Sequence, residues 1–123
     1  CVYWALHGED KKSIKIMVEE RFGYDLNFSL DEIRETYRFD VSCQGSVPQA
    51  IVAFLESSDY EDTIRGAVSI GGDSDTIAAI AGGIAEAFYK EIPSHIKNTV
   101  MKSLPDEFRE VLTSFYARCG RKI

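Results

Sequence analysis

The chain has 123 residues, of which 45% are hydrophobic and 28% are charged, a composition typical of one soluble globular domain with a modest core. Its formal net charge of −6 argues against nucleic acid or an anionic membrane as a partner. No stretch approaches the ~20 uninterrupted apolar residues of a membrane-spanning helix. The three cysteines have no metal-type spacing, so we expect reduced thiols in a cytoplasmic protein.

The first residues predict the end of an apolar helix. Residues 2–6, "VYWAL", are apolar, and the polar stretch "HGED" follows them. We interpret this segment as the last turns of a helix whose earlier part is missing, so that the chain is the C-terminal portion of something longer. The alternative is a small domain that begins with a tucked apolar tail.

Two helices are predicted next. Apolar residues over 14–22 follow a period of roughly 3.6 residues, and Gly23 is placed to end that helix. A second helix is predicted over "LDEIRETYRF", because Ser29 and Glu32 have the spacing of a capping box. The segment "FDVSCQGS" after it predicts an irregular connection.

The middle of the chain predicts two helices separated by a polar break. Ser46 is a natural N-cap for "VPQAIVAFLES", and Pro48 is tolerated in a first helical turn. After the break, "YEDTIRGAVSI" predicts a second helix, which the pair Gly71 and Gly72 would end.

The next helix is predicted to begin at Asp75 or Thr76 and to end near Tyr89. This helix has small apolar side chains on all sides, as in "AAIAGGIAEA", which predicts a buried, central helix. Each of its glycines costs roughly 1 kcal/mol of helix propensity, so we expect another element to pack tightly there.

The C-terminal part predicts two more helices. Pro93 and Ser94 predict a stop and a new N-cap, and "LPDEFREVLTSFYAR" predicts a final amphipathic helix. No strand-type alternation appears. The pattern therefore predicts an all-α fold, a compact array of helices forming a single domain over 1–123. The aromatic residues expected in its core are Trp4, Tyr24, Phe28, Phe39, Phe54, Phe88 and Tyr89.

The stretch "GGDSDT" places two carboxylates directly before the least polar segment. Helix capping alone is one interpretation, because Asp73, Ser74, Asp75 and Thr76 are all good N-cap or first-turn residues. A divalent-metal site is the other, because Asp73 and Asp75 can aim oxygens at one point and the Thr76 hydroxyl is a further hard ligand. Water and other parts of the fold would supply the remaining ligands.

The segment "AVSIGGDSDTIAAIAGGIAEAFYKEIP" closely resembles the C-terminal signature of the ADP-ribosylglycohydrolase family, and the resemblance extends to "CQGSVPQAIVAFLESSDYEDTIRGA" before it. It implies an all-α enzyme with a pair of metal ions, Mg²⁺ or alternatively Mn²⁺. Carried over residue by residue, it names Asp73, Asp75 and Thr76 as metal ligands, with Asp73 and Asp75 also as catalytic residues.

The resemblance implies hydrolysis of the glycosidic bond that joins ADP-ribose to an acceptor, with an ADP-ribosyl substrate as partner. The family's other ligands form a Thr-Asp-Asp type cluster in its N-terminal half, and nothing like it precedes Asp73. The chain therefore resembles only the C-terminal part of such an enzyme. We expect it to associate with itself or with the missing N-terminal half.

Three functions stay open at this level. The first is a fragment of a metal-assisted ADP-ribosyl hydrolase. The second is a non-catalytic module that binds ADP-ribose or a related nucleotide. The third is a purely structural helical domain whose acidic loop, residues 71–76, only caps a helix. Metal binding separates the first two from the third, and turnover separates the first from the second.

Overall fold

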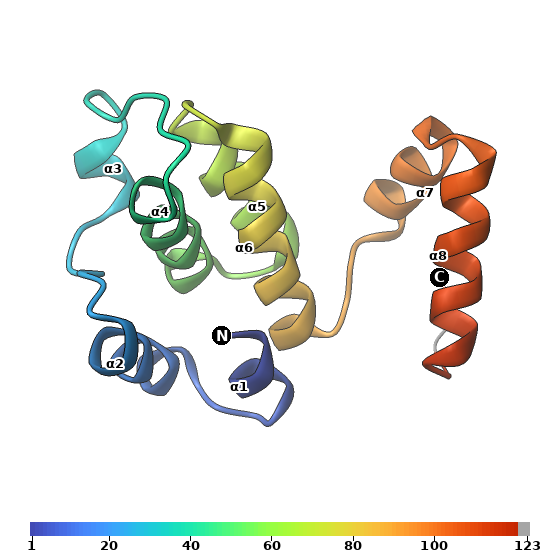
Figure 1. Ribbon diagram of the computed structural model, residues 1–123, viewed down its shortest axis with the longest axis horizontal. Coiled ribbons are helices and arrows are strands. Elements are labelled where there is room, and N and C mark those ends of the chain that lie inside the picture. Colours follow the sequence, from blue (N-terminus) through green and yellow to red (C-terminus); the bar gives the residue numbers. More distant parts are fainter. Residues whose placement is uncertain (121–123) are drawn as a thin grey trace. The chain divides into compact units, whose positions relative to one another are not determined.

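A computed structural model describes residues 1–120 of the chain (Figure 1). Its helices in chain order are α1 (Val2–Leu6), α2 (Lys11–Phe22), α3 (Leu30–Ile33), α4 (Cys43–Glu56), α5 (Tyr60–Ser69), α6 (Ser74–Tyr89), α7 (Ser94–Ser103) and α8 (Asp106–Arg118). The all-α prediction is confirmed. The helices group into two compact units, Cys1–Glu91 and Ile92–Ile123, which are described separately. The single domain over the whole chain stays a prediction.

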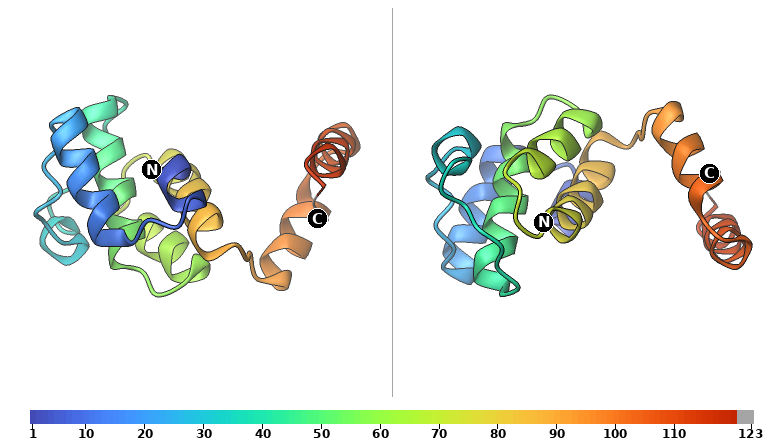
Figure 2. Two further views of the ribbon diagram at one scale, coloured as in Figure 1. Left: turned by 90° about the horizontal axis from the view of Figure 1, so that it is seen from below. Right: turned by 90° about the horizontal axis from the view of Figure 1, so that it is seen from above.

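The core of the first unit surrounds α6, which packs against α1, α4 and α5 (Figure 2). The predicted central position of this helix is confirmed. α2 lies beside α4, and Lys11 at its start contacts the carbonyl oxygen of Leu55 near the end of α4. Burial of apolar side chains, at about 25 cal/mol per Å², holds these helices together. The largest fully buried side chains are Phe54, Ile14, Ile77, Val18, Val52 and Thr63.

Capping bonds fix the ends of α2. The Asp10 side chain accepts a hydrogen bond from the Ser13 N–H at 2.7 Å, which satisfies a backbone donor that the helix leaves free. At the other end Gly23 has a φ of 69° and donates its N–H to the Glu19 carbonyl. The predicted stop at Gly23 is confirmed, because glycine adopts this left-handed conformation without a Cβ clash.

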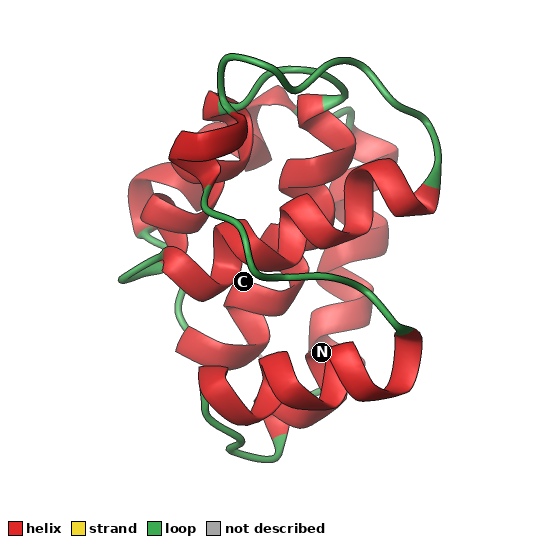
Figure 3. Ribbon diagram, turned by 90° about the vertical axis from the view of Figure 1, so that its left-hand side faces the viewer, coloured by secondary structure: helices red, strands yellow, loops and turns green. Residues whose placement is uncertain are grey.

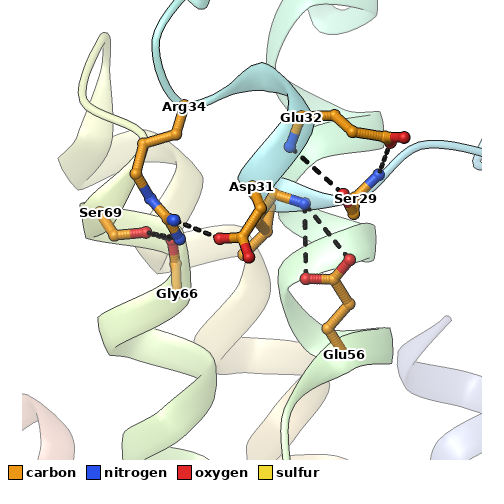
Figure 4. A network of polar contacts seen from close by, with 8 residues as sticks. Ser29, Asp31, Glu32, Arg34, Glu56, Gly66 and Ser69 are labelled. Carbon is orange, nitrogen blue, oxygen red and sulfur yellow. Dashed lines mark hydrogen bonds and ion pairs between the residues drawn. The ribbon is translucent and has the colours of Figure 1, made fainter.

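α3 has the predicted capping box but is much shorter than predicted. The Ser29 N–H donates to the Glu32 carboxylate at 2.7 Å, and the Glu32 N–H donates to the Ser29 hydroxyl at 3.2 Å (Figure 4). The prediction of a helix through "LDEIRETYRF" is wrong, since α3 ends at Ile33. The Glu56 carboxylate at the end of α4 accepts from the Leu30 N–H at 3.2 Å and fixes α3 there.

The chain after α3 is tied to the end of α5. The Arg34 guanidinium pairs with the Asp31 carboxylate and donates to the Ser69 hydroxyl at 3.2 Å (Figure 4). Ser69 in turn donates to the Gly66 carbonyl at 2.8 Å. Of these bonds only that between Arg34 and Ser69 is tertiary, and it joins the residue after α3 to the end of α5.

α4 begins earlier than predicted, and Ser46 is not its N-cap. The Ser42 hydroxyl caps the helix by accepting from the Gly45 N–H at 3.0 Å. The Asp40 carboxylate accepts from the Ser42 N–H at 2.7 Å and stabilises this earlier start. Ser46 lies buried inside the helix and donates to the Asp40 carbonyl at 3.0 Å. Pro48 therefore lies beyond the first turn, contrary to prediction.

The helix after the acidic loop, α6, is not buried on all sides as predicted. Ala79 and Gly83 are exposed and lie on the same face as the exposed Asp75. The tight packing expected from its small residues occurs on the opposite face, at Gly82. A Cβ on Gly82 would lie 2.9 Å from Cδ1 of Ile64 on α5.

The aromatic prediction is confirmed for all but one residue. Phe54 is fully buried, and the other side chains except Phe39 are half-buried against the core. Phe39 is 68% exposed in the connection between α3 and α4, so its assignment to the core is wrong. Cys1, Cys43 and Cys119 are free, as expected.

The second unit consists of α7 and α8. Pro93 takes the N-cap position of α7, and Ser94, the predicted cap, is the first helical residue. On α8 the side chains of Phe108, Val111 and Phe115 are exposed on one side, as the amphipathic pattern indicates. No described residue of this unit is buried.

The part of the chain that the structure describes contains helices and loops and no strand (Figure 3). None of its helices has the length and apolar character needed to cross a membrane.

Candidate metal site

The acidic loop connects α5 to α6. Gly71 and Gly72 have φ values of 71° and 66°, a pair of left-handed conformations that favours glycine over residues with a Cβ. Asp73 takes the N-cap position, and α6 begins at Ser74. The predicted turn at the glycines is confirmed, whereas the helix begins one residue before Asp75 and two before Thr76, the two predicted starts. The helix ends at Tyr89, as predicted.

The Asp73 side chain makes no capping hydrogen bond, although it occupies the capping position. Its backbone carbonyl accepts the first helical bond, from the Ile77 N–H at 3.0 Å. The backbone of Asp73 therefore begins the helix, while its half-buried side chain makes no capping bond to it. Capping does not account for the side chain of Asp73.

Asp75 and Thr76 lie exposed in the first turn of α6. A hydrogen bond with the Asp73 side chain lowers the pKa of Asp75, and the backbone N–H groups of Thr76 and of Asp75 itself lower it further. Amides at a helix start favour a carboxylate in this position. The capping interpretation thus retains a basis in Asp75.

The donor set of this loop fits a divalent cation. Asp73 and Asp75 lie two residues apart at the start of α6, so their carboxylates can offer oxygens to one cation. The Thr76 hydroxyl adds a third hard oxygen in the same helical turn. Mg²⁺ and Mn²⁺ prefer such oxygen ligands. The ligand roles of the three residues stay predictions.

The described residues do not form a complete metal-ligand set by themselves. Within residues 1–120 no three or more His, Cys, Asp and Glu side chains are grouped closely enough to hold a metal ion. A complete octahedral site would need further ligands from water or from protein beyond these residues.

A neighbour of the loop that the sequence pattern did not indicate is Tyr37. Its ring lies against Gly72, and a Cβ at Gly72 would lie 3.1 Å from Cδ1 of that ring. Burial raises the pKa of Tyr37, and the nearby carboxylates of Asp40 and Asp73 raise it too. No local periodicity or motif links these segments, because their contact is made only by the tertiary fold.

Comparison with known proteins identifies relatives of this chain. The model of the ADP-ribosylglycohydrolase family matches residues 6–122. An uncharacterized protein of Archaeoglobus fulgidus is 32% identical over 69 residues, which cover 56% of this chain. The matched part spans only 21% of that protein's own length. No solved structure matches the chain.

Proposed function

Because the chain belongs to the ADP-ribosylglycohydrolase family, we propose that it is part of a hydrolase that releases ADP-ribose from an acceptor, with Asp73, Asp75 and Thr76 in its metal site. The main observation in favour of a metal site is that the Asp73 carboxylate lies at a helix start without capping it. The family match supports the reaction class.

Each residue of the loop has a distinct part in this proposal. Asp73 and Asp75 supply the negative charge that holds cations, and Thr76 supplies a neutral hydroxyl oxygen. When bound, a pair of Mg²⁺ or Mn²⁺ ions supplies Lewis acidity and a water of lowered pKa for hydrolysis of a glycosidic bond. Because the two carboxylates set the charge next to that water, we assign them a catalytic role. The reaction adds water across the bond between the anomeric carbon and the acceptor atom.

We further propose that the remaining ligands come from outside this chain, from the N-terminal half of the family fold or from a second copy. The open ligand set of the described residues supports this. The exposed face of α6 supports it as well, since Ala79 and Gly83 continue the face that begins at Asp75. Small side chains there leave room for another element to approach closely.

A second candidate is a structural helical domain whose acidic loop only caps α6. The specific observation in its favour is that, after the Asp73 side chain, amides of the first helical turn lower the pKa of Asp75. In this case Asp73 and Thr76 would have no ligand to bind, and a cation would leave the loop unchanged.

Calorimetric titration of ADP-ribose into the purified chain, with Mg²⁺ and then with a chelator, tests the proposal. Asp75→Asn removes one carboxylate, and Glu20→Gln makes the same charge change on the exposed surface of α2. We expect heat that depends on Mg²⁺ for the wild type and Glu20→Gln, and a loss of that heat for a folded Asp75→Asn.

The outcomes separate the three functions. Metal-dependent binding with release of ADP-ribose from a modified peptide, by the chain alone or with an added N-terminal half, supports the hydrolase. Binding without turnover under both conditions indicates a binding module. The absence of heat in either buffer, with or without that half, would leave capping as the role of the loop.

A further inference from the structure

We propose that Tyr37 is a positioning residue that fixes the acidic loop against the start of α4 and thereby sets the place of Asp73. As a statement about metal binding, the proposal rests on the function proposed above. Figure 1 shows the connection after α3 and the loop between α5 and α6 at the same end of the first unit.

The first part of the argument is the contact between the Tyr37 ring and the backbone of the loop. The ring lies where the Cβ of any other residue at position 72 would be, with Cδ1 at 3.1 Å from that point. The Arg38 carbonyl lies 3.3 Å from the same point. Gly72 therefore lets an aromatic ring lie directly on the turn, and a side chain there would push the ring away.

The second part is the anchor at the other end of the side chain. The Tyr37 hydroxyl donates to the Gly45 carbonyl in the first turn of α4 at 2.6 Å. The ring is half-buried and packs against the core. A side chain held by its hydroxyl and by its ring contact has little conformational freedom, so it can hold the loop at a fixed position relative to α4.

The third part is the weakness of the loop by itself. Two consecutive glycines with positive φ have a high conformational entropy in the unfolded chain, which folding must overcome. Gly71 has no neighbour within 4 Å of its Cβ position. The Gly71 N–H donates to the Val68 carbonyl at 3.1 Å, which holds the α5 side of the turn. On the α6 side the Tyr37 ring contacts Gly72, and Asp73 follows that residue directly in the chain.

Two variants and a matched control test the proposal. Tyr37→Ala removes the ring, and Tyr37→Phe keeps the ring but removes the hydroxyl. Phe39→Ala removes an aromatic ring two residues away that is 68% exposed. The readouts are the backbone amide NMR signals of the acidic loop and Mn²⁺ affinity, measured by the loss of the free-ion EPR signal.

We expect Tyr37→Ala to shift or broaden the amide signals of the loop and to lower Mn²⁺ affinity by about tenfold, the lower range for loss of a group that orients ligands. Tyr37→Phe should retain most of the affinity, because it keeps the ring contact. Phe39→Ala should leave both readouts unchanged. The signals of α2 serve as the folding control and should not move in any variant.

The two readouts separate this proposal from the proposed function. If the wild type binds no Mn²⁺, even with its N-terminal partner present, the metal site fails, while the NMR signals still decide whether Tyr37 orders the loop. If Tyr37→Ala leaves the loop signals at their wild-type positions, the positioning role is overturned. If it moves those signals but Mn²⁺ affinity matches that of Phe39→Ala, the link to Asp73 is overturned.

Discussion

Lys11 joins three elements of the first unit through one ammonium group. Its Nζ donates to the Leu55 carbonyl at 3.2 Å and also to the Ser57 carbonyl, at the end of α4. It lies 5.0 Å from the ring centroid of Phe54 and within 5.7 Å of two ring centroids at the end of α6. The charge therefore binds carbonyls at a helix end and lies over aromatic faces, two interactions that favour a cation.

We expect Lys11→Met to lower the free energy of unfolding by about 2 kcal/mol, the range for loss of hydrogen bonds to a charged group. Lys12→Met changes the neighbouring exposed lysine in the same way and should cost less than about 0.5 kcal/mol. Urea unfolding of the two variants measures the difference. Equal unfolding midpoints for both would show that the Lys11 contacts contribute little.

The titration of Asp10 makes the stability of the folded chain depend on pH. The Ser13 N–H, followed by the Ser13 side chain, lowers the pKa of Asp10. A lowered folded-state pKa adds stability that is present above the unfolded value and is lost as the pH falls through the folded value. Asp10→Asn keeps an acceptor at the cap but cannot titrate.

Between about pH 5 and about pH 2 the free energy of unfolding should therefore fall more steeply for the wild type than for Asp10→Asn. At pH 7 the two proteins should have similar stability. Urea unfolding across this range provides the measurement, and parallel curves would contradict a titrating cap at this position.

At the scale of single residues, local chemistry could be predicted and tertiary contacts could not. The stop at Gly23 and the capping box of Ser29 depend on neighbours in the chain, and both were predicted. The choice of Ser42 over Ser46 as the cap also had a local signal that the prediction missed, because Asp40 lies two residues before Ser42 and accepts its N–H in an Asx-type turn. The contact of Tyr37 with the acidic loop lacks a local signal altogether.

At the scale of elements, the two adjacent glycines of α6 lie on different surfaces. Gly82 faces α5, where a Cβ would lie 2.9 Å from Ile64 Cδ1 and 3.3 Å from the Tyr60 hydroxyl. Gly83 has no atom within 4 Å of its Cβ position. The same substitution at the two positions therefore separates helix propensity from packing.

We expect Gly83→Ala to raise the free energy of unfolding by about 1 kcal/mol, the propensity difference between the two residues in a helix. Gly82→Ala should lose this gain, because Ile64 must move to admit the new methyl group. Thermal unfolding of the pair tests the assignment. Equal stabilisation by both substitutions would show that α5 does not restrict Gly82.

Helix existence was predictable for most of the chain, but the exposed face of α6 was not. The pattern of small apolar residues is the same whether a helix is buried within its own unit or faces another element, because both environments exclude large polar side chains. Ala79 and Gly83 looked buried for this reason. Their exposure agrees with the proposal that another element packs on this face.

At the scale of the whole molecule, every buried residue of the described chain lies in the first unit. Residues 92–120 form two helices without a buried side chain. Because packing supplies most of the stability of helices in proteins, the two units have very different capacities to fold alone.

A chain of residues 1–91 should therefore unfold in one cooperative transition, whereas residues 92–123 alone should show little helix. Circular dichroism during thermal unfolding measures both. Stable, cooperative helix in the isolated second segment, or its requirement for folding of the first, would contradict this division.

The candidate site was predictable only as far as its local part. The residues Asp73, Asp75 and Thr76 follow from one motif, and the structure brings them into one helical turn. Further ligands of the proposed metal site have no signal in this sequence, since a metal site combines segments that are distant in the chain. The division into units was also not apparent, because both parts have amphipathic helices of similar length.

The short loop between α5 and α6 has a consequence for folding order. The two helices pack against each other across a connection of few residues, so closing that connection costs little entropy. The contact of α1 with α6 instead closes a loop that spans nearly the whole first unit.

We expect the amides of α5 and α6 to gain protection before those of α1 in pulsed hydrogen exchange during refolding, and the reverse order would contradict this. The carboxylates of the acidic loop would then come together in the first helical hairpin to form, so that a cation bound there as proposed above would stabilise an early step of folding.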